Sequence, residues 1–133
     1  MAMAPRDMTT RDKTSRDAAK QSRSAARLYA VQALFQMEAS GTDLTAVQEE
    51  FETHRMGVEL DGDELAEGDL DLFRALVSGA VSGQAQIDQT ANTALDAAWP
   101  IRRIDPTLRA LFRAAGAEFM ADQTPVKVTI NEY

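Results

Sequence analysis

The 133-residue sequence contains no cysteine, so disulfides and thiolate metal sites are excluded. This absence agrees with a reducing compartment, and we expect a cytoplasmic protein. No apolar run approaches the length of a membrane span, and the polar N-terminus lacks the apolar region of a secretory signal. The sequence therefore predicts neither a membrane segment nor export.

Residues suited to catalysis are equally scarce. His54 is the only histidine, and beside Arg55 it is interpreted as a solvent-facing residue rather than a catalyst. No glycine-rich phosphate loop is present. The single tryptophan, Trp99, precedes Pro100 and is interpreted as a packing anchor at a helix end. We predict no catalytic residue, no metal site and no cofactor.

Charge is distributed unevenly along the chain. Residues 1–27 hold seven Lys/Arg and three Asp, a net charge of +4, whereas residues 28–133 hold seven Lys/Arg and eighteen Asp/Glu, a net charge of −11. A basic arm on an acidic body indicates a local anionic ligand, and the alternative is a solubilising tail. Residues 1–22 are polar without a hydrophobic period, so we predict a disordered basic arm that orders on binding.

Two helices are predicted in the first half of the chain. The first covers residues 24–40, with Ser24 as N-cap and Gly41 just beyond its C-terminal end. Its predicted buried face consists of Leu28, Val31, Leu34 and Phe35. The second covers residues 43–57. The acidic stretch 57–68 is interpreted as a solvated loop, since it lacks the ligand spacing of a calcium loop.

Two longer helices are predicted in the second half. One covers residues 69–99, is weakened by two glycines in its middle, and is ended by the following proline. The next covers residues 106–122, with Asp105 as N-cap and Pro106 at the first helical position. Its predicted buried face is Leu108, Leu111, Phe112, Ala115 and Phe119. We expect Phe112 to be buried where this helix meets Phe73.

The last stretch, residues 126–133, alternates apolar and polar side chains as a strand does. The sequence offers no second strand for it to pair with, and an unpaired strand leaves its backbone groups unsatisfied. We therefore predict a short helix, with Thr124 as cap and Pro125 at the first helical position.

Four stretches together resemble the NusB family of bacterial transcription antitermination factors. They are residues 27–36 (RLYAVQALFQ), 73–79 (FRALVSG), 111–119 (LFRAAGAEF) and 126–132 (VKVTINE). The Ala-Val-Gln-Ala-Leu-aromatic run and the closing Lys-Val-x-Ile-Asn-Glu are the most specific. The stretches keep the family's order and separation, so the resemblance covers roughly residues 20–133.

The resemblance implies an all-α fold of two small packed helical subdomains over residues 23–133. The family continues past the Ile-Asn-Glu run, so the second subdomain is expected to be incomplete here, and self-association through uncovered faces is expected. The implied function is binding of boxA RNA together with the small-subunit ribosomal protein that acts as NusE. Other Nus factors and RNA polymerase would be engaged indirectly.

Carried over by position, the family's RNA-binding segment falls on Arg23 and Arg27, with Lys20 as a looser candidate and Gln32 on the same surface. Phe35, which stands where tyrosine is frequent, is the expected partner-binding residue. Ser24 and Ala25 replace consecutive arginines found in several family members.

Two other classes of protein remain open at this point. One is the NusB-like RNA-binding module of an rRNA methyltransferase, which would need a further Rossmann domain with a methyl-donor site. The other is a protein-interaction module with an incidental basic tail. Salt-dependent RNA binding separates an RNA-binding factor from a pure interaction module.

Overall fold

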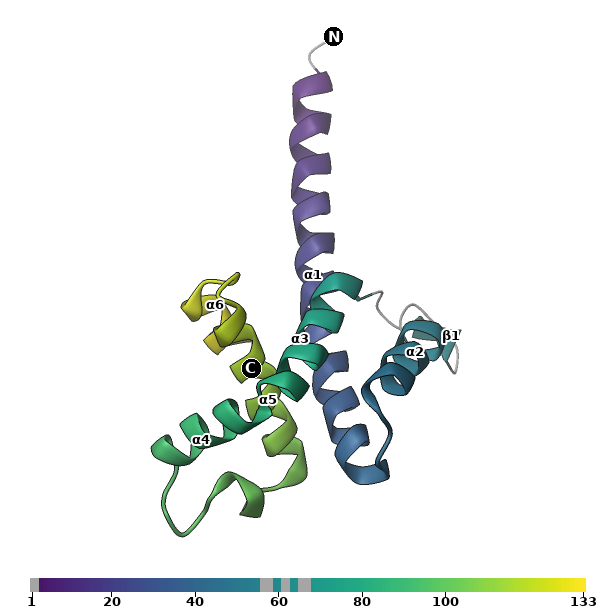
Figure 1. Cartoon of the computed structure of the whole chain (residues 1–133). Helices are drawn as coiled ribbons and strands as arrows, with labels where there is room; N and C mark the ends of the chain where they lie inside the picture. The colour runs from purple at the N-terminus through teal and green to yellow at the C-terminus, as the bar shows by residue number, and fades with distance from the viewer. Residues whose placement is uncertain (1–2, 56–58, 61–62, 65–67) are drawn as a thin grey trace.

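The first helix, α1 (Met3–Ser40), runs past the other elements, and its N-terminal half projects from them (Figure 1). The computed structural model describes residues 3–55, 59–60, 63–64 and 68–133. Residues 3–22 are helical in this structure, whereas the sequence predicts an arm that is disordered until it binds; residues 1–2 lie outside the described residues. No glycine or proline interrupts residues 6–40, so the helix that the packed half nucleates extends toward the N-terminus.

The sequence predicts a cap at each end of the first helix. Gly41 has a φ of 72°, and its N–H donates to the carbonyl of Met37 at 2.9 Å, which confirms the C-terminal cap. The N-cap prediction is wrong, because Ser24 lies well inside α1. The Ser24 hydroxyl instead donates to Glu132 near the other end of the chain.

The second helix, α2 (Leu44–His54), begins as predicted, with the Asp43 carboxylate accepting the Ala46 N–H at 2.8 Å. Beyond it, β1 (Glu59–Leu60) and β2 (Asp63–Glu64) form a two-residue antiparallel ladder. The rest of the predicted acidic loop, at positions 56–58, 61–62 and 65–67, lies outside the described residues. Its interpretation as a solvated loop without calcium therefore stays a prediction.

The predicted single helix over residues 69–99 is wrong, because the chain forms two helices, α3 (Leu70–Ser82) and α4 (Gln84–Ala94). They divide at Gly83, whose φ of −100° and ψ of 8° lie outside the helical range. A Cβ at Gly83 would lie 3.0 Å from the Gly79 carbonyl oxygen and 3.2 Å from the Met120 methyl carbon. The glycine thus permits a bend that lays α4 along α5.

The segment between α4 and α5 differs from the prediction in where it begins and in which residue anchors it. The helix α4 ends at Ala94, five residues before its predicted limit, and Trp99 is 62% exposed, so the prediction of a packing anchor is wrong. A 3-10 turn, η1 (Ile101–Arg103), follows, and its first N–H donates to the Asn92 side chain at 2.7 Å. Ile101 is buried and provides the anchor instead.

The last two helices begin close to where the sequence predicts. In α5 (Pro106–Ala121), the Asp105 carboxylate accepts the Thr107 N–H at 2.8 Å and Pro106 takes the first turn, as predicted. The final segment forms α6 (Val126–Glu132), which confirms a helix rather than a strand. Its N-cap is Pro125, one residue later than predicted, without a side-chain cap.

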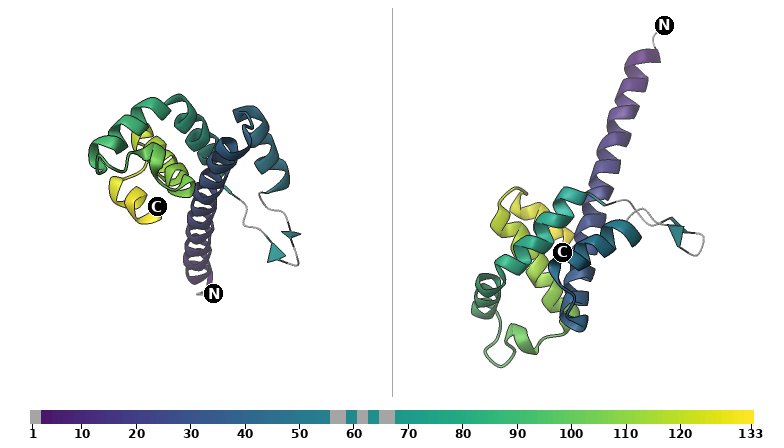
Figure 2. Two further views of the ribbon diagram at one scale, coloured as in Figure 1. Left: turned by 90° about the horizontal axis from the view of Figure 1, so that it is seen from below. Right: turned by 45° about the vertical axis from the view of Figure 1, so that its right-hand side comes forward.

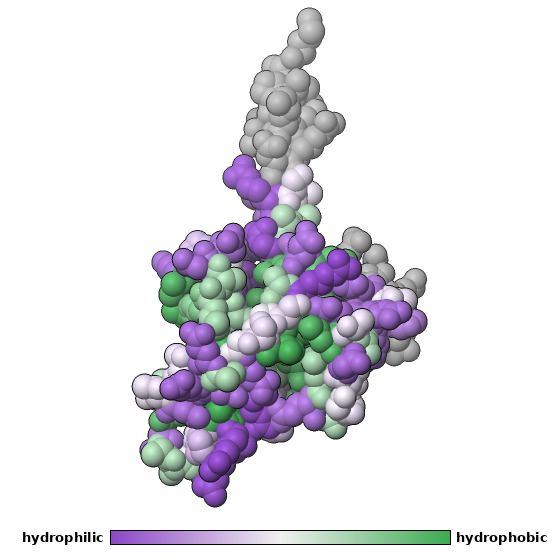
Figure 3. All heavy atoms as spheres, in the orientation of Figure 1, coloured by the Kyte–Doolittle hydropathy of each residue, from purple (hydrophilic) through white to green (hydrophobic). Residues whose placement is uncertain are grey.

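Helices α1, α3 and α5 pack against one another, α2 covers α1 and α3, and α4 and α6 flank α5 (Figures 1 and 2). The all-α prediction is confirmed, apart from the short ladder between α2 and α3. No helix in the described ranges is both long and apolar enough to cross a membrane. On the face in Figure 3, hydrophilic residues predominate on the described part of α1 where it leaves the body.

The buried faces of α1 and α5 are shifted from those predicted. On α1 the buried apolar residues are Ala26, Tyr29, Ala30, Ala33 and Leu34, whereas Leu28 is 58% exposed. On α5 they are Ala110, Ala114 and Ala117, whereas Leu108 and Phe119 are exposed. Small side chains let the central helices approach closely, and a Cβ at Gly79 would lie 3.4 Å from that of Ala117. Close packing therefore selects the alanine faces rather than the bulkier ones.

The aromatic core lies between α1, α2 and α3. Phe73 is fully buried, as predicted, and its ring stacks on that of Phe51 at 5.7 Å between centroids. The Tyr29 ring meets Phe51 edge-on at 6.3 Å. Phe112 is only partly buried, in a groove between α4 and α5, so the prediction of its full burial is wrong.

Candidate functional site

The projecting part of α1 carries exposed cationic side chains. Lys13, Arg16, Lys20 and Arg23 are all exposed and follow one another at spacings of three and four residues. That spacing places them along one side of a helix. A shallow groove continues toward the body and is lined by Asp17, Lys20, Gln21, Ser24, Ala25 and Leu28. This row of four exposed cations, called the basic face below, suits an extended anionic ligand.

Arg27 continues the same spacing but does not belong to the exposed surface. It is 4% exposed, and its guanidinium forms a fork with the Glu118 carboxylate, through Nε at 2.9 Å and Nη2 at 2.8 Å. The sequence predicts Arg27 as an RNA-binding residue, but here Glu118 holds its Nε and Nη2 in the interior, and Nη1 lies 3.5 Å from the partly exposed Glu132. Arg27 ties α1 to α5, which is a structural task.

Glu118 is the centre of this buried cluster. It is 2% exposed and also accepts a hydrogen bond from the Tyr133 hydroxyl at 2.9 Å. Burial alone would raise the pKa of Glu118, but hydrogen bonds from Arg27, Thr124 and Tyr133 hold that pKa below 4.5. Burial, with the neighbouring Glu118 charge, raises the pKa of Tyr133. Glu118 therefore stays ionised and joins α1, α5 and α6.

A second carboxylate reaches the same edge of α1 from α6. Glu132 accepts the Ser24 hydroxyl at 3.0 and 3.2 Å through its two oxygens, and lies 3.5 Å from Arg27 Nη1. Its side chain is 20% exposed, so it lies at the boundary between the buried cluster and solvent. The residues just after the basic face thus face two carboxylates.

Gln32 and Phe35 lie on another side of α1. At about 100° per residue, Gln32 points roughly opposite to Arg23. Both Gln32 and Phe35 are exposed and line a groove whose other residues are Leu28, Val31, Gln36, Ala39, Ser40, Phe51, Arg55 and Thr107. The structure therefore groups Gln32 with Phe35, in a mainly apolar groove between α1 and α2, rather than with the basic face.

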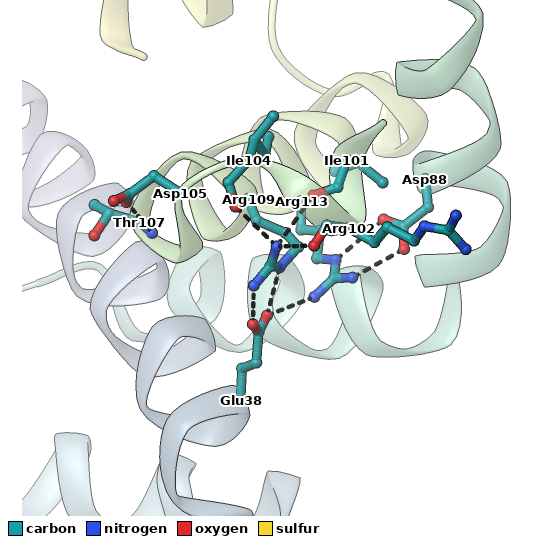
Figure 4. A network of polar contacts seen from close by, with 9 residues as sticks. All are labelled: Glu38, Asp88, Ile101, Arg102, Ile104, Asp105, Thr107, Arg109 and Arg113. Carbon is teal, nitrogen blue, oxygen red and sulfur yellow. Dashed lines mark hydrogen bonds and ion pairs between the residues drawn. The ribbon is translucent and has the colours of Figure 1, made fainter. Parts of the chain in front are cut away.

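A separate ionic network joins Glu38 of α1 to Arg109 and Arg113 of α5, and Arg113 to Asp88 of α4 (Figure 4). Arg109 pairs with Glu38, and its Nη1 donates to the carbonyls of Ile101, Arg102 and Ile104 at 3.0–3.1 Å. Arg113 bridges Glu38 at 3.2 Å and Asp88 at 2.9 Å. The hydrogen bond from Arg109 lowers the pKa of Glu38 against the effect of partial burial. The network fixes η1 and α4 against α1.

Sequence reasoning missed the ionic residues that hold the fold. Arg27 with Glu118, and Arg109 with Glu38, join positions 91 and 71 residues apart. One signal was available, because Arg109 and Glu118 interrupt an otherwise alanine-rich side of the predicted helix. A charged residue on a buried side requires a partner, although the sequence does not identify which residue provides it.

The fold and the basic face define an all-helical protein with a cationic helix on an acidic body. The NusB family model matches residues 24–133. The chain is 46% identical over 112 residues to transcription antitermination protein NusB of Agrobacterium fabrum, covering 84% of this chain and 68% of that protein. It is 45% identical over 112 residues to the protein of that name from Sinorhizobium fredii, covering 84% and 70%. No solved structure matches the chain. The chain belongs to the NusB family.

Proposed function

We propose that this protein acts in transcription antitermination by binding boxA-type RNA through the basic face of α1, together with the ribosomal protein that acts as NusE. The family assignment over residues 24–133 is the observation that carries the proposal. Other Nus factors and RNA polymerase are engaged through this complex, in the cytoplasm. The proposed role is binding, without a chemical step or cofactor.

The described charges support an RNA contact confined to α1. Lys20 and Arg23 are exposed, and within the described ranges neither side chain forms an ion pair with a carboxylate. Exposed cations of this kind contact phosphates and set the position of a nucleic acid. The remaining chain carries a net charge of −11 over residues 28–133, which repels RNA elsewhere. Binding is therefore expected to depend on the basic face.

The apolar groove beside Phe35 supports a protein partner on another side of α1. Phe35 is 40% exposed and Leu28 is also exposed, so the groove offers apolar area to a docking segment. A basic ribosomal protein complements the acidic body. Since the groove and the basic face lie on different sides of α1, RNA and protein partner can be held together.

Changing Lys20→Ala together with Arg23→Ala is expected to weaken binding to a boxA-type RNA oligonucleotide about two- to thirtyfold, because the change removes two exposed cations that bind phosphates. Fluorescence anisotropy at fixed ionic strength measures it. Arg102→Ala with Arg103→Ala is the matched control, since it removes two exposed arginines at η1, whose loop Figure 1 shows at the end opposite the projecting part of α1. Equal reductions in affinity in both double variants would contradict a localised RNA surface.

Changing Phe35→Ala is expected to weaken binding of the partner ribosomal protein by about tenfold, the effect of removing one aromatic anchor. The affinity of the variant for RNA alone should not change. Isothermal titration with the purified partner measures the effect. The control is Ile130→Ala on α6, an exposed apolar residue that does not line this groove. An unaltered partner affinity in Phe35→Ala would show that the groove is not part of the interface. If the protein binds the partner but no RNA, it is a pure protein-interaction module.

A further inference from the structure

The Glu132 carboxylate contacts two donor groups on α1, the Ser24 hydroxyl and Arg27 Nη1. Glu118 takes Nε and Nη2 of Arg27, so Nη1 has only the Glu132 contact at 3.5 Å within the described chain. The Ser24 hydroxyl donates to both Glu132 oxygens. Glu132 therefore fills a position that has one hydroxyl donor and one guanidinium N–H, a combination that phosphate oxygens also accept.

This position is continuous with the basic face. Ser24 directly follows Arg23 and lies one helical turn from Lys20, and it lines the same shallow groove as Lys20. A strand of RNA that lies on Lys20 and Arg23 would reach the Ser24 hydroxyl with its next phosphate. In the structure, it would meet the Glu132 carboxylate there.

The net charge of the cluster formed by Arg27, Glu118 and Glu132 repels a phosphate at this position. Glu118 and Glu132 together bring two negative charges to the single positive charge of Arg27, so the cluster carries one net negative charge. Glu118 alone neutralises Arg27, and α6 has a further attachment through the Tyr133 hydroxyl. The charge of Glu132 is thus not needed to compensate Arg27.

We propose that Ser24 Oγ and Arg27 Nη1 form a phosphate subsite of the RNA surface, which Glu132 occupies when RNA is absent. The inference rests on the proposed RNA-binding function and adds a residue that limits RNA affinity. An RNA phosphate displaces the Glu132 carboxylate from the two donors. Glu132 consequently lowers the affinity of the free protein for RNA.

The test is the affinity for a fluorescent boxA-type RNA oligonucleotide, measured with Glu132→Gln. The amide keeps the size of the side chain and removes its charge. Binding is expected to tighten about threefold, the effect of deleting one unit charge about 6 Å from a phosphate in water. Glu49→Gln is the matched control, because it makes the same charge change at an exposed site on α2. The control is expected to change the affinity far less.

Ser24→Ala distinguishes the subsite from a general charge effect. In the wild-type background the change removes the hydroxyl's bond to Glu132 in the free protein as well as its bond to phosphate in the complex, so RNA affinity should alter little. In the Glu132→Gln background it should remove part of the gain. Glu132→Ala provides a second neutral variant, and thermal unfolding confirms that each variant is folded.

The outcomes separate this inference from the proposed function. RNA binding by the wild type without a gain in Glu132→Gln or Glu132→Ala beyond that of Glu49→Gln would overturn the subsite alone. So would an equal effect of Ser24→Ala in both backgrounds. Absence of RNA binding by the wild type and by both neutral variants would overturn the proposed function and the subsite together.

Discussion

Changing Glu118→Ala is expected to lower the free energy of unfolding by about 3–5 kcal/mol, the usual cost of removing one partner of a buried ion pair. The change leaves the Arg27 guanidinium buried with only the distant contact to Glu132. It also removes the acceptor of the Tyr133 hydroxyl. Because the cluster joins three helices, the destabilisation should affect the whole fold rather than α6 alone.

Urea denaturation followed by circular dichroism measures the destabilisation. Glu52→Ala is the control, since Glu52 pairs with the exposed Arg74 and its removal should change stability far less. Replacing both partners with apolar residues, Arg27→Met with Glu118→Leu, should recover most of the stability. A decrease below about 1 kcal/mol in Glu118→Ala would show that Arg27 is not held as the structure describes.

The pH dependence of stability follows from the same cluster. The folded-state pKa of Glu118 lies below 4.5, its ordinary value. A carboxyl group with a lowered pKa contributes stability that is present above pH 4.5 and is lost as pH falls through the folded-state pKa. The stability of Glu118→Ala should therefore fall less steeply than that of the wild type in this acidic range.

Changing Phe73→Ala is expected to cost about 3–5 kcal/mol, because the ring is fully buried and its removal leaves a cavity beside Phe51. Phe112→Ala is the matched comparison and should cost about 1–2 kcal/mol, since that ring is only partly buried in the groove between α4 and α5. Chemical denaturation of both variants measures the difference. Equal decreases in stability would contradict the placement of the aromatic core.

Local chemistry made the ends of several helices predictable. Asp43, Asp105 and Pro106 act within one turn of their helix, and Gly41 supplies a positive φ that other residues adopt at a cost. The break at Gly83 was not predictable from propensity alone, because a glycine weakens a helix without fixing where it ends. The Met120 methyl carbon lies 3.2 Å from where a Cβ at Gly83 would be.

The buried faces and the role of Arg27 depend on contacts between distant parts of the chain. Hydrophobic period favours the bulkier side of α1, whereas close helix approach buries its alanine side. The family resemblance assigns Arg27 to RNA binding, and only Glu118, 91 residues later, removes it from the surface. The exposure of Lys20 and Arg23 was predictable because they lie in or next to the polar stretch of residues 1–22, which has no hydrophobic period.

The salt dependence of RNA binding tests the central claim most directly. The logarithm of the association constant for a single-stranded boxA-type RNA is measured against the logarithm of salt concentration, for the wild type and for Lys20→Ala with Arg23→Ala. The account predicts that the slope becomes shallower by about 0.7 for each phosphate contact removed, or about 1.4 in total. An unchanged slope, with the RNA still bound, would contradict the assignment of the RNA surface to the basic face of α1.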